Sequence, residues 1–244
     1  MSIIALLSAK GGVGKTTTAV NLAALSAAAG LSTLIIDLDP QGASSHLLRI
    51  KTTEGLKAKR FWSGKADVDE LIRASDIAGL DVLPATDSLR RADAVLEDLD
   101  HPRRRLAGIV DSLVGWERII LDCPPGLGLL SENILRAADL VLVPVAPSPL
   151  ALRMLAPLTA LAAGAAGRVR PFVSMARGKE TAIAELRAAW PQTLSTAIPL
   201  ARMVEESAAE RHPVALQAPR SRVALAYRRF QREIESILTS QAET

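Results

Sequence analysis

The sequence is poor in cysteine and in aromatic residues. Its 244 residues include one cysteine, one tyrosine, three phenylalanines and three tryptophans. The single cysteine, Cys123, excludes an internal disulfide and any zinc or iron–sulfur site built from several cysteines, and it suits a reducing compartment. We interpret it as a small buried side chain. The three histidines are scattered without ligand spacing, so we assign them no role.

Long apolar runs and linker-like segments are also missing. No apolar run approaches the roughly 18 residues of a membrane-spanning helix, and we expect no membrane association. The chain enters a predicted strand without a charged leader, so we expect no signal peptide and a cytoplasmic location. Because there is no Gly/Ser/Pro-rich linker and no internal repeat, we predict that residues 1–244 form a single domain.

Charge is distributed unevenly. The net charge is +3, but the segment from Arg168 to Arg232 holds twelve Lys and Arg against five Asp and Glu. A basic C-terminal third indicates a face that meets a polyanion. Solvated helix faces explain the composition equally well, so charge alone leaves both interpretations open.

One short segment predicts a binding chemistry. Residues 8–17 read Ser-Ala-Lys-Gly-Gly-Val-Gly-Lys-Thr-Thr, between an apolar run over residues 3–7 and a helical pattern over residues 17–29. Glycines at this point let backbone N–H groups approach phosphate oxygens, and a helix N-terminus adds positive charge. Lys15 is placed to reach the β- and γ-phosphates, and the Thr16 hydroxyl is placed to bind Mg²⁺. The segment predicts binding of a nucleoside triphosphate.

Apolar runs alternate with helical patterns along the whole chain. Strands are predicted at residues 33–39, 80–83, 118–122, 140–145, 170–174 and 196–198, with helices at 88–99, 103–114 and 222–238. This order predicts an α/β fold, a mostly parallel twisted sheet with helices on both faces. Ligands of such sheets lie beyond the carboxyl ends of the strands, where Lys15, Asp39 and Asp122 fall.

Three blocks of sequence carry a family resemblance. They are the segment from Lys10 to Thr17, Asp-Leu-Asp-Pro-Gln-Gly at residues 37–42, and Asp-Cys-Pro-Pro-Gly-Leu-Gly at residues 122–128. With its additional lysine at position 10, the chain resembles the deviant Walker-A ATPases of the ParA/MinD family of P-loop NTPases. Within that family it is most similar to the ParA (Soj-like) partition ATPases.

The resemblance implies roles for individual residues. Lys10, Lys15 and Asp39 would be catalytic: Lys10 would reach the partner subunit's nucleotide in an ATP-bound homodimer, and Asp39 would orient the attacking water. Mg²⁺ would be held by Thr16, Asp37 and Asp122, although strand-end capping is the alternative for the carboxylates. The residues implied in ATP binding are Lys10, Gly11, Gly12, Val13, Gly14, Lys15, Thr16, Thr17, Asp122 and Pro199.

The resemblance also implies partners: nonspecific double-stranded DNA, and a ParB-like or other adaptor that stimulates hydrolysis, with a nucleoid-associated location. The residues implied in DNA binding are Arg202, Arg220, Arg222, Arg228 and Arg229, with Arg177, Lys179 and Arg211 as further candidates. Met1 lies close to the first predicted strand, so we expect no N-terminal DNA-reading domain.

Alternatives remain. The first is a MinD-like membrane-associated ATPase, for which Arg228, Arg229 and Phe230 are the supporting residues. An amidoligase such as a cobyrinate synthase is disfavoured, because the chain leaves little room for a substrate domain. The segment Ile50–Asp69 is interpreted as a solvated loop with a packed aromatic pair, Phe61 and Trp62, or else as a partner-docking patch.

Overall fold

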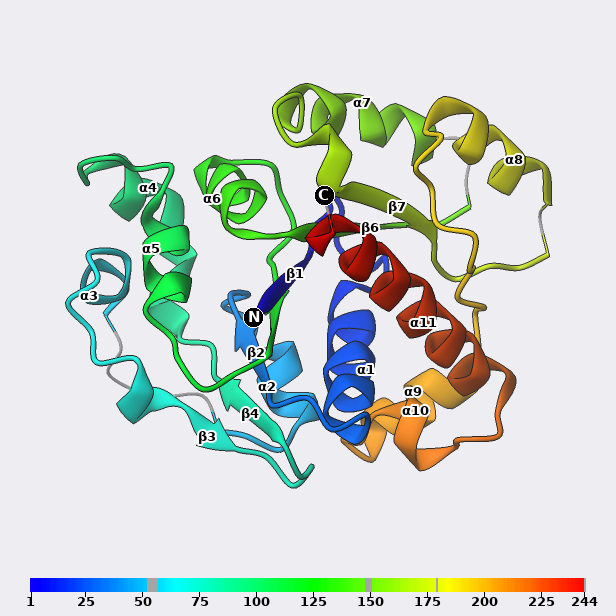
Figure 1. Ribbon diagram of the computed structural model, residues 1–244, viewed down its shortest axis with the longest axis horizontal. Coiled ribbons are helices and arrows are strands. Elements are labelled where there is room, and N and C mark those ends of the chain that lie inside the picture. The colour runs from blue at the N-terminus through cyan, green and yellow to red at the C-terminus, as the bar shows by residue number, and fades with distance from the viewer. Residues whose placement is uncertain (52–56, 148–150, 179, 244) are drawn as a thin grey trace.

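A seven-stranded sheet forms the centre of the molecule (Figure 1). The computed structural model describes residues 1–51, 57–147, 151–178 and 180–243. The strand order is β3-β4-β2-β5-β1-β6-β7, with β3 antiparallel to β4 and every other neighbouring pair parallel. The strands are β1 (Ser2–Leu6), β2 (Thr33–Asp37), β3 (Arg73–Ala74), β4 (Leu80–Leu83), β5 (Arg118–Asp122), β6 (Leu140–Val145) and β7 (Val169–Val173).

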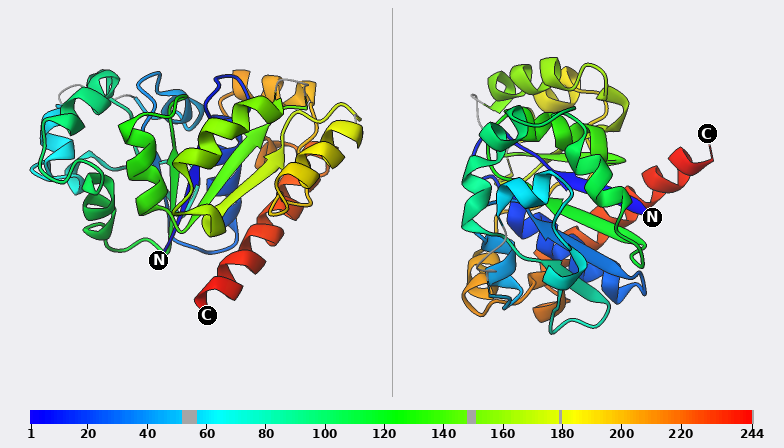
Figure 2. Two further views of the ribbon diagram at one scale, coloured as in Figure 1. Left: turned by 90° about the horizontal axis from the view of Figure 1, so that it is seen from above. Right: turned by 90° about the vertical axis from the view of Figure 1, so that its left-hand side faces the viewer.

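Helices cover both faces of this sheet, which confirms the predicted α/β fold. On one face, α1, α2, α10 and α11 pack together, and α11 crosses α1 (Figure 1). On the other face lie α3 to α8, and the C-terminal end of α11 projects away from the body (Figure 2). The helices are α1 (Lys15–Ala28), α2 (Ala43–Leu47), α3 (Ala58–Trp62), α4 (Ala92–Glu97), α5 (Arg105–Asp111), α6 (Leu129–Ala137), α7 (Ala151–Leu161), α8 (Glu180–Ala189), α9 (Arg202–Ala209), α10 (Val214–Gln217) and α11 (Arg222–Ala242).

Two cores separated by the sheet follow from the alternation of side chains along each strand. In β1, Ile4 and Leu6 point to the cluster that contains Phe230, whereas Ile3 and Ala5 point to the opposite cluster. Because successive strand residues face opposite ways and both faces are covered, the strands must be apolar throughout. Among the described residues, no helix is both long and apolar enough to cross a bilayer.

The predicted strand at residues 196–198 is wrong. The segment runs beside β7, where Leu194 N donates to Pro171 O and Ile198 N donates to Val173 O, both at 2.8 Å. A regular ladder does not form there, because Pro171 and Pro199 have no N–H to donate. A single bridge between Ala176 and Pro199 remains.

The interpretation of Ile50–Asp69 as a solvated loop is also corrected. Residues 58–62 form α3, and Phe61 and Trp62 are buried with ring centroids 4.8 Å apart. The aromatic pair is therefore packed into the core, as expected, but from a helix. Residues 52–56 lie outside the described part of the chain.

Candidate nucleotide site and basic surface

The loop between β1 and α1 brings its glycines to the carboxyl end of the sheet. Gly14 begins α1 with φ 91°, a left-handed conformation, and a Cβ on it would lie 2.9 Å from Ser174 Oγ at the end of β7. Glycine is therefore required here both by backbone conformation and by space. Gly11 and Gly12 are exposed, Val13 is buried, and Thr16 and Thr17 on the first turn of α1 are half-buried.

Lys15 lies inside this loop with its side chain 6% exposed. Its Nζ donates to Ser8 Oγ at 3.2 Å and to the Lys10 carbonyl at 3.4 Å. Burial lowers the pKa of the Lys15 ammonium, and the nearby Asp122, Cys123 and Asp39 oppose that shift. A buried ammonium that has only neutral hydrogen-bond acceptors is well suited to an added anion.

Asp122, at the end of β5, is the least satisfied acid of the site. It is fully buried, and within the described chain neither carboxylate oxygen accepts a hydrogen bond. Burial and repulsion by Asp37 raise its pKa to about 8, while the nearby Thr16 side chain opposes the shift. Orphaned carboxylate oxygens beside a hydroxyl are the oxygen ligands that Mg²⁺ prefers, so these residues fit that ion.

Asp37 lies opposite Asp122 in the sheet register but has partners of its own. Its Oδ2 accepts hydrogen bonds from Ser45 N at 2.9 Å and Ser45 Oγ at 2.6 Å, and its Oδ1 accepts from Asp39 N at 3.3 Å. Burial raises the pKa of Asp37, and these donors oppose the shift. Asp37 therefore holds the start of α2 in place, which is the capping alternative to metal ligation.

The two remaining catalytic candidates are more accessible. Asp39 is half-buried, its Oδ1 accepts from Gln41 N at 2.9 Å, and its charge acts on both Lys15 and Asp122. Lys10 is exposed at the outer edge of the loop. Pro199 is half-buried and pairs with Ala176, which places it on the β7 side of the site.

The loop after Asp122 is fixed by residues that sequence reasoning missed. Gly126 N donates to Ser8 O at 3.1 Å, Ser131 Oγ donates to Gly126 O at 3.0 Å, and Leu130 N donates to Asp93 Oδ1 at 2.7 Å. Ser8 could have been found from its place just before the glycines. Asp93 and Leu130 are 37 residues apart in the sequence, and no local sequence pattern predicts the hydrogen bond between them.

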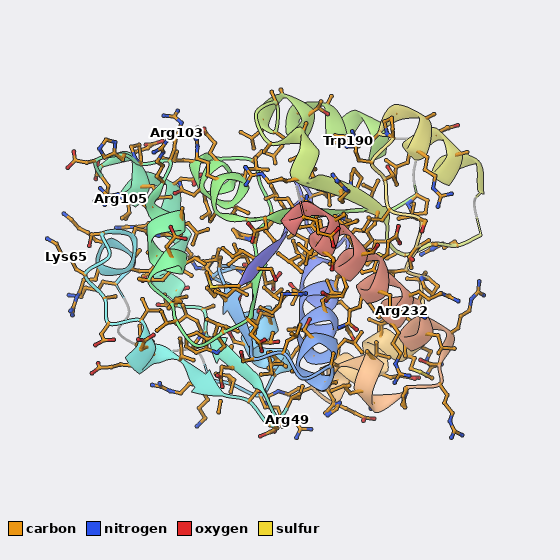
Figure 3. The ribbon with its side chains drawn as sticks, in the orientation of Figure 1. Arg49, Lys65, Arg103, Arg105, Trp190 and Arg232 are labelled. Atoms are coloured by element: carbon orange, nitrogen blue, oxygen red, sulfur yellow. The ribbon has the colours of Figure 1, made fainter. Side chains whose placement is uncertain are left out.

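The DNA-binding candidates are all exposed, on α9, α11 and the turn before α11. Arg202 pairs with Glu206 at 3.0 Å. Arg220 and Arg222 flank Ser221, whose Oγ accepts from Ala224 N and caps α11. Arg228 and Arg229 line an open groove together with Leu225, Gln231 and Arg232. Figure 3 marks Arg232 on α11, a basic residue that our sequence analysis did not include among the DNA-binding candidates.

Other basic candidates lie differently. Arg211 is half-buried and its Nε donates to the His46 carbonyl at 2.7 Å. Arg177 is exposed beside the β7 end of the site, and Lys179 lies outside the described residues. Cys123 is fully buried beside Asp122, as expected.

Comparison with known proteins places this site in a family. A model of the AAA domain matches residues 1–171. The chromosome-partitioning ATPase Soj of Thermus thermophilus is 35% identical over 243 residues, which cover 95% of this chain and 94% of the relative. The chain belongs to the ParA/Soj family of P-loop ATPases.

Further relatives agree with this placement. The chromosome partitioning protein ParA of Myxococcus xanthus is 41% identical over 160 residues, 64% of this chain. That match spans little more than half, 56%, of the M. xanthus protein.

Among solved structures, a cobyrinic acid a,c-diamide synthase of Mycobacterium smegmatis with bound ATP analogue and magnesium has a TM-score of 0.80. It is 23% identical, and the likeness covers 99% of this ParA/Soj-family chain and 97% of that one. A likeness at this identity shows the fold alone and does not test the amidoligase alternative.

Proposed function

We propose that this chain is a partition-type ATPase that binds MgATP, dimerises on it, binds DNA without sequence preference and positions a cargo. The single observation that supports this most is the buried, unpartnered Asp122 carboxylate beside Lys15 and Thr16. Such an arrangement is costly without a ligand and is stabilised by a divalent cation together with an anion. In this proposal residues 1–244 act as one ATPase domain.

The residues of the site take distinct parts in hydrolysis. Lys15 binds the β- and γ-phosphates of ATP with the loop N–H groups, and Thr16 and Asp122 hold Mg²⁺, which offsets phosphate charge. Asp37 keeps the strand end and α2 aligned through Ser45. Asp39 orients a water whose oxygen attacks the γ-phosphorus while the bond to the β–γ bridging oxygen breaks, which gives ADP and phosphate. The exposed Lys10 contacts the partner subunit's phosphates.

The DNA-binding part of the proposal is supported by the orientation of α11. Its apolar side is packed into the core, with Phe230 and Ile234 fully buried and Tyr227 2% exposed. The arginines therefore face solvent, where contact with phosphates requires only positive charge. The same packing argues against the MinD-like alternative, because an interfacial helix would need that apolar side for lipid.

The names of the relatives suggest the cargo class. The T. thermophilus and M. xanthus relatives are chromosome-partitioning proteins. We propose that the cargo of this chain is a chromosome region, a plasmid or a protein assembly. The dimer that positions the cargo would lie on the nucleoid in the cytoplasm. A ParB-like or other adaptor would accelerate hydrolysis.

A gel-shift titration tests the proposal. Random-sequence duplex DNA is titrated with the chain without nucleotide, with MgADP and with MgATP, each at two salt concentrations. We expect binding with MgATP alone and a steep loss at the higher salt. Equal binding in all nucleotide states contradicts the proposal, and ATP-dependent binding to anionic liposomes without DNA binding favours the MinD-like alternative.

The role of Asp39 has its own test. Asp39→Ala removes the group that orients water but leaves Lys15 and Asp122 in place. We expect ATP binding and dimerisation to persist, phosphate release to stop, and the dimer to stay on DNA. Normal turnover by this variant contradicts the assigned role.

A further inference from the structure

Two helices end in the same unusual way. Just after α2 and α9, Arg49 and Arg211 have φ angles of 61° and 54°, the left-handed conformation. Arg49 N donates to His46 O and Arg211 N donates to Ala208 O, both at 3.0 Å, which closes each helix end. Glycine usually occupies this position, because a Cβ strains the left-handed backbone by about 1 kcal/mol or more. Both ends therefore retain a strained arginine.

The side chains of these two arginines reach across to one another's helix. Arg211 Nε donates to the His46 carbonyl in α2 at 2.7 Å, and Arg49 Nη2 donates to the Glu210 carbonyl at the end of α9 at 3.2 Å. Arg49 Nη1 also lies 3.5 Å from Asp76 Oδ2. Figure 3 shows Arg49 at the lower edge of the molecule. Each arginine thus donates to a carbonyl at the C-terminal end of the other helix, where the helix dipole favours a cation.

The two joined helices lead to different functional parts of the chain. α2 follows the Asp39 loop, and Ser45 within it is bonded to Asp37 through both its N–H and its hydroxyl. α9 follows the segment that contains Pro199 and carries Arg202 on its first residue. The arginine pair, Arg49 with Arg211, therefore joins α2, which is bonded to the acidic strand end, to the exposed helix α9, which begins at Arg202.

We propose that Arg49 and Arg211 are positioning residues that couple the nucleotide loop to the DNA-facing helix α9. A change at Asp37 and Asp39 on binding MgATP moves α2, and the arginine pair passes that movement to α9 and Arg202. The coupling is reciprocal, so DNA bound at α9 raises the affinity for MgATP by the same factor. This inference rests on the proposed function.

Glycine substitution distinguishes the effect of losing the side-chain contacts from an effect on the backbone conformation. Arg49→Gly with Arg211→Gly removes both side chains, while glycine accepts the left-handed conformation without strain, so both helix ends stay closed. His101→Gly is the matched control, because His101 is an exposed residue with φ 51° in the turn before α5. Relief of backbone strain alone would affect the control and the double variant alike.

The measured quantity is the ratio of the DNA dissociation constants with MgADP and with MgATP. We expect the double variant to lower this ratio at least about 5-fold, the lower end of typical coupling factors, and His101→Gly to leave it unchanged. Each single variant should lower it to a similar degree. An unchanged ratio in the double variant overturns the inference. A second result would also overturn the inference: Arg211→Gly alone weakens DNA binding in both nucleotide states and reduces its salt dependence. Arg211 would then contact DNA phosphate directly.

Hydrogen exchange keeps this test separate from the proposed DNA binding. In the unmodified chain, MgATP should slow amide exchange at the ends of both α2 and α9; in the double variant it should slow exchange at α2 alone. If the chain fails to bind DNA but shows this difference, the DNA-binding proposal fails while the coupling stands. Equal protection of α9 in both proteins overturns the coupling.

Discussion

At the scale of single residues, the two lysines of the phosphate loop have different surroundings. Lys15 is 6% exposed and bonded to Ser8, whereas Lys10 is exposed and its side chain faces solvent. Lys15 is therefore enclosed by the loop of its own chain, whereas Lys10 is accessible for the contact with a partner subunit that we propose. Both lysines were predicted as site residues from the sequence, but their difference in burial required the structure.

We predict that Lys15→Ala abolishes ATP binding, because the buried ammonium is the charge that faces the phosphates. A charge-assisted hydrogen bond contributes about 1.5–3 kcal/mol, so the affinity for ATP should fall by at least about 10- to 100-fold. Lys10→Ala should bind ATP normally but fail to dimerise. Calorimetric titration and light scattering measure the two effects, and retained ATP affinity in Lys15→Ala contradicts the phosphate-loop assignment.

Asp122 gives a prediction on pH. Its folded-state pKa of about 8 lies above the ordinary value of 3.8, so without metal the native state holds the extra proton between these values. The free energy of unfolding should then fall as pH rises from about 4 to about 8, by at most about 1.4 kcal/mol per pH unit from this group. Above about pH 8 the contribution of Asp122 to the free energy of unfolding no longer changes with pH.

Asp122→Asn cannot ionise and should remove this contribution. In chelator-treated protein we expect the variant to be more stable than the unmodified chain at pH 8 and nearly equal to it at pH 4, by urea unfolding. Added Mg²⁺ should stabilise the unmodified chain at pH 8 but not the variant. An identical pH dependence in both proteins would mean that Asp122 already ionises freely.

At the scale of elements, the loop after Asp122 depends on a cap donated by a different helix. Asp93 of α4 accepts the Leu130 N–H and so caps α6, and a Cβ on Gly128 would lie 2.0 Å from Asp93 Oδ2. Gly128 is therefore needed because the carboxylate lies directly against its backbone. The cap holds the end of the loop whose Gly126 is bonded to Ser8 beside Lys15.

We predict that Asp93→Ala and Gly128→Ala act on this same cap. Asp93→Ala removes the acceptor, and Gly128→Ala pushes the carboxylate aside, so each should cost about 1 kcal/mol of stability. The double variant should cost little more than either single variant. Asp93→Asn, which keeps an acceptor oxygen, should recover most of the loss. Fully additive losses in urea unfolding would show that the two residues do not share one interaction.

The elements themselves were largely predictable, since apolar runs bounded by glycine and acidic residues gave β1, β2, β4, β5 and β6 nearly to the residue. The miss at residues 196–198 has a local cause, because its neighbour β7 contains Pro171. β3 is two exposed residues long and leaves no periodic pattern. Ser45 Oγ also accepts a hydrogen bond from Ala85 N, and Asp93 accepts one from Leu130 N. These partners are distant in sequence, so the contacts depend on packing that a sequence pattern does not contain.

At the scale of the whole molecule, basic residues lie on opposite sides of the sheet. Figure 3 shows Arg103 at the upper left and Arg232 on α11 right of centre, and the helices α4 and α5 lie on the opposite face of the sheet from α11. Arg220 and Arg222 lie at the start of α11, whereas Arg91 and Arg104 are exposed on the α4–α5 side. The net charge of the chain does not tell which of these two surfaces binds DNA. A comparison of matched variants on the two surfaces does.

We predict that Arg220→Ala with Arg222→Ala weakens DNA binding through lost phosphate contacts, while ATP-driven dimerisation persists because neither residue lies at the phosphate loop. Each lost contact lowers the slope of log K against log salt by about 0.9, so two contacts lower it by about 2 for each protomer. Arg91→Ala with Arg104→Ala removes the same charge from the other side and should leave the slope unchanged. If the control lowers the slope and the α11 pair does not, the α4–α5 side is the DNA-binding surface.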